Sequence, residues 1–163
     1  MNILISACLL GFDVKYDGTN NSHLLDPLKL ERLKKMTNLI PVCPESWGGL
    51  ECPRQPCERS GEKVISATGE DKTAQFTKGA NQVLKLAKMF NCQYALLKEN
   101  SPSCGAGKIY DGSFSHTLVA GDGVTAELLD QNDIKIFGES KLDELLEAVR
   151  LAKMPLQLTF TFE

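Results

Sequence analysis

The chain has 163 residues, a length that fits one domain with an ordinary hydrophobic core. Its hydrophobic fraction of 42% and charged fraction of 24% are typical of a globular protein, and its net charge of −3 predicts no broad positive field. No apolar stretch approaches the about 20 residues of a membrane helix. We therefore expect neither a nucleic-acid partner nor a membrane-embedded protein.

The first residues predict a strand and not an export signal. Ile5-Ser6-Ala7-Cys8 has the form of a bacterial lipoprotein cleavage site, but only seven residues precede Cys8 and none of them is Lys or Arg. A signal peptide needs a charged start and a longer apolar region. We expect residues 2–7 to form a short buried strand and the protein to be cytoplasmic.

Strands and helices alternate along the rest of the chain. Asp26-Pro27 predicts a helix start, because a capping residue precedes a proline at the first helical position. The other expected elements are strands at 39–43, 93–98 and 134–137, helices at 71–91, 124–130 and from 140 onward, and a strand-like tail at 156–162. Residues 44–70 are expected to be one long irregular loop, which is usually functional in a compact domain. The alternation predicts an α/β fold, with a single-domain, doubly wound (Rossmann/flavodoxin-like), mainly parallel sheet and helices on both faces.

A cysteine lies at or just past the end of each of three predicted strands, namely Cys8, Cys43 and Cys104. Parallel strands end at one edge of their sheet, where open α/β sheets bind ligands, so the three thiols are expected to be neighbours. Three thiolates without a fourth partner suit a [4Fe–4S] cluster that leaves one iron open. From spacing alone, three alternatives remain: a zinc site, a redox or nucleophilic thiol, and cysteines that are merely buried.

The other three cysteines do not follow predicted strands. Cys92 lies near the end of a helical pattern and is interpreted as a small buried side chain. Cys52 and Cys57 form a C-x4-C pair beside the site. A disulfide, a metal site and no function are all compatible with that pair, although a cytosolic redox potential disfavours a lasting bridge.

Four segments, taken together and in order, resemble the thiouracil desulfurase family. They are Cys8-Leu9-Leu10-Gly11 with Lys15-Tyr16-Asp17-Gly18, Pro41-Val42-Cys43-Pro44-Glu45 through Gly48-Gly49-Leu50, Pro53-Arg54-Gln55-Pro56-Cys57-Glu58, and Leu97-Lys98 to Ser101-Pro102-Ser103-Cys104-Gly105. The resemblance spans roughly residues 2–150 of one expected domain at 1–163, and leaves 151–163 as a C-terminal extension with a possible strand. It implies a cytosolic enzyme that removes sulfur from a thiolated pyrimidine such as 2-thiouracil. The [4Fe–4S] cluster would then be bound by the three cysteines and supplied by cluster-assembly machinery.

Glu45 and Ser101 are the expected catalytic residues, and the resemblance points to the same two positions. Glu45 follows Cys43 by two residues, so both side chains point the same way if the segment is extended. Its carboxylate would deprotonate the water that attacks the ring carbon, while the open iron binds the thiocarbonyl sulfur. Ser101 would orient substrate or relay the proton. The structural alternatives are that Glu45 caps a turn and that Ser101 starts the Ser-Pro bend.

The remaining candidates have weaker support. Tyr16, Asp17 and Ser103 are expected in the substrate pocket, although Asp17-Gly18 is equally an ordinary turn. Arg54 and Glu58 are interpreted as a pair that braces the long loop.

Two other functions fit the same cysteines. One is a sulfur-transfer or tRNA-thiolation partner, against which the acidic composition argues. The other is a non-catalytic metal-binding or redox-sensing module, which would require neither Glu45 nor Ser101.

Overall fold

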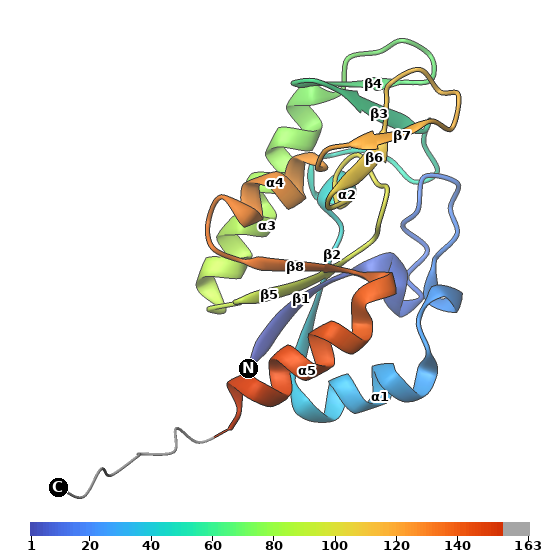
Figure 1. The fold of residues 1–163 in the computed structure, drawn as a ribbon. Coiled ribbons are helices and arrows are strands. Elements are labelled where there is room, and N and C mark those ends of the chain that lie inside the picture. The colour runs from blue at the N-terminus through green and yellow to red at the C-terminus, as the bar shows by residue number, and fades with distance from the viewer. Residues whose placement is uncertain (155–163) are drawn as a thin grey trace, which may run out of the picture.

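The computed structural model describes residues 1–154, so the strand predicted at 156–162 lies outside the described residues. Its centre is a four-stranded parallel sheet in the order β2-β1-β5-β8 (Figure 1). The strands are β1 (Asn2–Ser6), β2 (Asn38–Val42), β5 (Tyr94–Leu97) and β8 (Lys135–Gly138). The α/β class and the parallel sheet predicted from the sequence are confirmed.

Helices cover both faces of this sheet. They are α1 (Pro27–Met36) and α5 (Leu142–Ala152) on one face, and α3 (Thr73–Met89) and α4 (Val124–Asp130) on the other. Because successive side chains of a strand point to opposite faces, Ile3 and Ile5 pack in the core beside α5, whereas Leu4 packs in the core beside α3. In Figure 1, α1 and α5 lie below the sheet, and α3 and α4 lie on its other side. Among the described residues, no helix is long and apolar enough to cross a membrane.

The segment predicted as an irregular loop at 44–70 contains regular structure, so that prediction was wrong in part. It holds the short helix α2 (Pro44–Trp47) and a hairpin of β3 (Cys57–Ser60) and β4 (Lys63–Ser66). A second unpredicted hairpin pairs β6 (Lys108–Tyr110) with β7 (Leu118–Ala120). These strands have only three or four residues each, which is too short to show the apolar alternation by which a strand is recognised.

Helix α2 lies with its backbone directly against α3. A Cβ atom added at Gly79 would overlap the carbonyl oxygen of Pro44, and one added at Gly48 would overlap that of Gln75. Only glycine permits backbones to approach this closely. The helix that follows the second cysteine is therefore fixed in position by α3.

Candidate functional site

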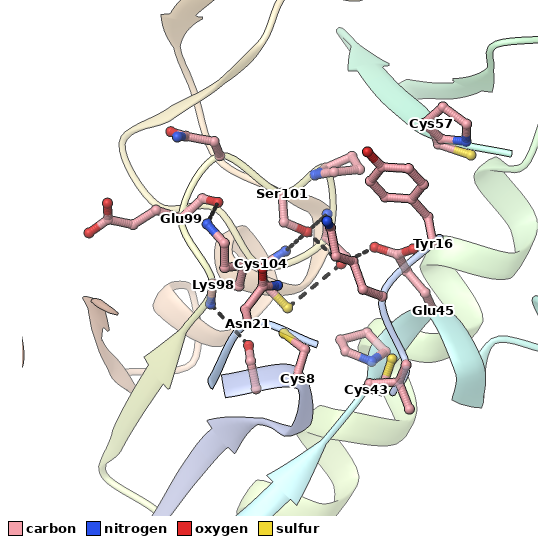
Figure 2. A pocket seen from close by; sticks show the side chains of 18 of the residues that line it. Cys8, Tyr16, Asn21, Cys43, Glu45, Cys57, Lys98, Glu99, Ser101 and Cys104 are labelled. Carbon is pink, nitrogen blue, oxygen red and sulfur yellow. Dashed lines mark hydrogen bonds between the residues drawn. The ribbon is translucent and has the colours of Figure 1, made fainter. Parts of the chain in front are cut away.

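A cavity of about 470 Å³ lies at the carboxyl edge of the parallel sheet. The loops after β1, β2 and β5 line it, together with residues of both hairpins. Cys8, Cys43 and Cys104 all line this cavity, and Figure 2 shows them around one space with Glu45 and Ser101 above them. The structure thus brings together the three cysteines that the strand pattern singled out.

Each cysteine is positioned by the turn that ends its strand. Cys8 lies in a single 3₁₀ turn at 7–10 that ends at Gly11, whose φ of 93° is in the left-handed region. Cys43 is the residue before the first turn of α2. Cys104 lies in the turn after β5, whose backbone touches the start of α4, since a Cβ atom at Gly123 would overlap the main chain there. Backbone geometry therefore fixes all three ligand candidates.

The environment of Cys8 and Cys104 favours the protonated form of their thiols. Burial raises the pKa of the Cys104 thiol to about 12, and it also raises the pKa of Cys8. Charges on the neighbouring cysteines act in the same direction, because three thiolates close together repel one another. A reactive thiolate needs the opposite, a lowered pKa. Bound metal offsets this repulsion, so the set suits a metal centre better than a free nucleophile.

The spacing of the three cysteines also helps to distinguish a zinc ion from a cluster. Within residues 1–154, no three His, Cys, Asp or Glu side chains lie close enough to share one metal ion. A structural zinc ion takes four ligands at one point. In a cubane cluster each cysteine binds its own iron, and the ligands are therefore further apart. Cys8, Cys43 and Cys104 therefore do not converge on one point as the ligands of a single zinc ion would.

The segment after Cys43 is helical and not extended, so Glu45 lies in the first turn of α2, and both of its carboxylate oxygens accept hydrogen bonds. Arg54 donates to Oε2 from Nε at 2.8 Å and approaches it with Nη2 at 2.7 Å, and Ser103 Oγ donates to Oε1 at 2.9 Å. The side chains of Arg54 and Glu45 are only 8% and 14% exposed. The predicted pairing of Arg54 with Glu58 is wrong, because Arg54 binds Glu45 instead.

Glu58 instead holds in place a loop that forms one side of the cavity. Its Oε2 accepts hydrogen bonds from the N–H groups of Gly112 and Phe114, both at 2.9 Å, which ties the loop at 111–117 to β3. Phe114, Tyr110 and His116 line the cavity. No pattern in the sequence pointed to these three residues, which come from a hairpin that was not predicted.

Ser101 is both a cavity residue and a turn residue. Its Oγ lies 3.0 Å from Ser103 Oγ and accepts the N–H groups of Ser103 and Cys104, each at 3.2 Å. Ser103 also approaches the sulfur of Cys104, at 3.6 Å. Ser101 therefore stabilises the Ser-Pro bend, which was its structural alternative, and it is also linked to Glu45 through Ser103.

The two pocket candidates in the loop after β1 have different positions. Tyr16 lines the cavity. Asp17 does not, and its prediction as a pocket residue is corrected: its carboxylate accepts from Lys15 Nζ at 2.8 Å and from Thr19 Oγ1 at 2.6 Å in an exposed turn. These bonds, that of Lys15 first, lower the pKa of Asp17 to about 2. Its ordinary-turn interpretation is the one that the structure bears out.

The three other cysteines are free thiols, as are the ligand candidates. Cys92 is buried outside the cavity, and Cys52 is exposed, with its sulfur 3.2 Å from the carbonyl oxygen of Lys15. Cys57 lines the cavity, where burial raises its pKa to about 11. Nothing in its spacing predicted that position, because it depends on the course of the loop before β3.

Comparison with known proteins identifies the family. The family model described as 2-thiouracil desulfurase matches residues 3–141. The chain belongs to the 2-thiouracil desulfurase family. The resemblance seen in the four segments is thereby confirmed, and this chain is a member of an enzyme family.

The chain also matches two relatives over nearly their full lengths. The uncharacterized protein YbbK of Bacillus subtilis (strain 168) is 39% identical, over 88% of this chain and 99% of YbbK. The solved structure of the [4Fe-4S]-dependent thiouracil desulfidase TudS is 43% identical and superposes with a TM-score of 0.87, over 92% of this chain and 98% of TudS. A homologue of the same fold is thus a [4Fe–4S]-dependent enzyme.

Proposed function

We propose that this protein removes sulfur from a thiolated pyrimidine such as 2-thiouracil, with a [4Fe–4S] cluster on Cys8, Cys43 and Cys104. The observation that carries the proposal is that one cavity contains these three thiols together with Glu45 and Ser101. When bound, the cluster supplies a Lewis-acidic iron without a protein ligand, suited to bind the thiocarbonyl sulfur and polarise its carbon. The dependence of TudS on such a cluster supports this cofactor.

Residues of the chain activate the water that attacks the substrate. Glu45 takes a proton from the water that attacks the ring carbon, and Ser101 orients the substrate or relays that proton. In the net reaction a thiocarbonyl group and water become a carbonyl group and hydrogen sulfide, so that one oxygen replaces one sulfur and both water protons leave with the sulfide. The reaction needs no external electrons.

The cavity suits a small flat substrate better than a tRNA. Its volume of about 470 Å³ is that of a small-molecule site, for which about 300–1,000 Å³ is usual. The aromatic side chains of Tyr16, Tyr110 and Phe114 line it and offer faces on which a heteroaromatic ring stacks. We place the enzyme in the cytoplasm, where thiols stay reduced and cluster-assembly machinery would load it.

The cofactor and the activity are tested together in protein purified and reconstituted without oxygen. We expect about four iron and four sulfide per chain, as a cubane cluster requires. The loaded protein should convert 2-thiouracil to uracil and release one sulfide per turnover, and the metal-free protein should not. Stoichiometric zinc without iron in strictly anaerobic preparations would contradict the proposal.

The open iron is tested by removing the spare cysteines near the site. The double variant Cys52→Ser, Cys57→Ser is expected to keep its full iron content, because neither thiol is needed as a ligand, and to keep most of its activity. Iron and sulfide analysis and turnover of 2-thiouracil measure this. The loss of one iron per chain would reveal a fourth protein ligand, and the substrate sulfur would then have no vacant iron.

A further inference from the structure

Two residues beside the catalytic pair, Arg54 and Ser103, bond to different carboxylate oxygens of Glu45. We propose that Ser103 carries the proton between Ser101 and Glu45, and that Arg54 is the positioning residue that aims Glu45 along this path. The inference rests on the proposed function and adds to it two residues without which Glu45 would not work as a base.

The directions of the hydrogen bonds follow from counting hydrogens. Ser103 has one hydroxyl hydrogen, and its Oγ lies 2.9 Å from Glu45 Oε1, an acceptor that has no hydrogen to give when ionised. Ser103 therefore donates to Glu45. The second hydroxyl, Ser101 Oγ at 3.0 Å, must then donate to Ser103. The result is a directed chain of hydrogens from Ser101 through Ser103 to Glu45, with all three residues lining the cavity.

Arg54 determines which oxygen of Glu45 is free to receive a proton. Its Nε and Nη2 both bind Oε2, at 2.8 and 2.7 Å. The guanidinium is itself fixed, because Nη2 donates to the carbonyl oxygen of Val14 at 3.0 Å and Nη1 to that of Glu51 at 3.2 Å. Because Oε2 is bound to the permanently charged guanidinium of Arg54, only Oε1 is left to accept a proton. Oε1 is the oxygen that accepts the hydrogen bond from Ser103.

The proton transfer balances along this chain. The attacking water gives a proton to Ser101 as Ser101 gives its own to Ser103, and Ser103 gives its own to Glu45 Oε1. The carboxylate becomes neutral, and its negative charge passes to the oxygen that attacks the ring. The N–H groups of Ser103 and Cys104, which point at Ser101 Oγ, stabilise negative charge there during the transfer. Ser103 is only 1% exposed, so bulk water does not take its place.

The test combines single and double variants. Ser103→Ala and Arg54→Gln should each lower kcat for 2-thiouracil by about 10²-fold, the usual effect of misplacing a reacting group. KM and iron content should stay the same, and Arg54→Lys should recover part of the rate. In a Glu45→Gln background neither change should cause a further loss, because residues that act through one group have non-additive effects.

Matched controls separate this role from packing. Ser66 is also 1% exposed, and Arg59 also pairs with a glutamate, Glu127 at 2.6 Å, but neither lines the cavity. Ser66→Ala and Arg59→Gln should lower the midpoint of thermal unfolding and leave kcat unchanged. If Arg54→Gln loses iron, Arg54→Lys and Ser103→Ala decide the outcome.

The two proposals fail in different ways. Wild-type kcat in Ser103→Ala or Arg54→Lys with intact clusters would overturn the relay, and so would a full further loss of kcat when either change is added to Glu45→Gln. An unchanged kcat in Glu45→Gln alone would instead contradict the proposed role of Glu45 as the base.

Discussion

The Cys104→Ser variant is expected to lose its iron and its desulfurase activity together. Cys104 is the most buried of the three ligand candidates, and a hydroxyl at this position is a far weaker ligand than a thiolate for iron. Two remaining cysteines would leave two irons of a cubane without a protein ligand. Iron and sulfide analysis after anaerobic reconstitution, with turnover of 2-thiouracil in the same sample, measures both losses.

Cys92 provides the matched control for this variant. It is 6% exposed, against 5% for Cys104, but it lies outside the cavity. Cys92→Ser should therefore cost a similar amount of folding stability and retain about four irons per chain, as the proposed cluster requires. A Cys104→Ser protein that kept a full cluster would remove Cys104 from the ligand set, and the assignment of Cys8 and Cys43 would then need the same test.

The Glu45→Gln variant should keep the cluster and lose about 10²- to 10⁴-fold in kcat, the usual contribution of a positioned acid or base. Glutamine has the same shape, and its amide oxygen still accepts a hydrogen bond from Arg54, but it does not accept the proton. Steady-state kinetics on protein of measured iron content separate this loss from cofactor loss.

Its control is Glu127→Gln, which removes the carboxylate that pairs with Arg59 away from the cavity. That change should leave kcat at the wild-type value. If Glu45→Gln also turned over at the wild-type rate, Glu45 would have only the structural role of an acidic residue in the first turn of α2.

The sheet was predictable because its strands are short apolar runs bounded by turn residues. Ile3, Leu4 and Ile5 are completely buried, as a strand covered on both faces requires. The two hairpins were not predictable, because their strands pair with each other beyond the sheet edge and bury few side chains. In β3, for example, only Glu58 is buried, and a buried glutamate resembles no strand pattern.

The positions of the site residues were predictable to the extent that they follow strand ends. The positions of the three cysteines follow from the order of strands alone, whereas Glu45 was predicted from an extended segment after Cys43 that is the first turn of α2 in the structure. The hydrogen-bond partners of the site residues were not predictable. Arg54, for example, binds Glu45 because of the course of a loop that no local sequence pattern specifies. The bond from Phe114 to Glu58 spans 56 residues and depends on the same kind of tertiary placement.

The close backbone contacts at Gly48, Gly79 and Gly123 make one side of the cavity rigid. A single methyl group at any of these positions would overlap main-chain atoms of α2, of α3 or of the turn that carries Cys104. The loop at 111–117 is held differently, because two of its N–H groups donate hydrogen bonds to the carboxylate of Glu58. Laboratory evolution toward bulkier thiones should therefore find its accepted changes in that loop and at Tyr16, while the cysteine-bearing turns stay as they are.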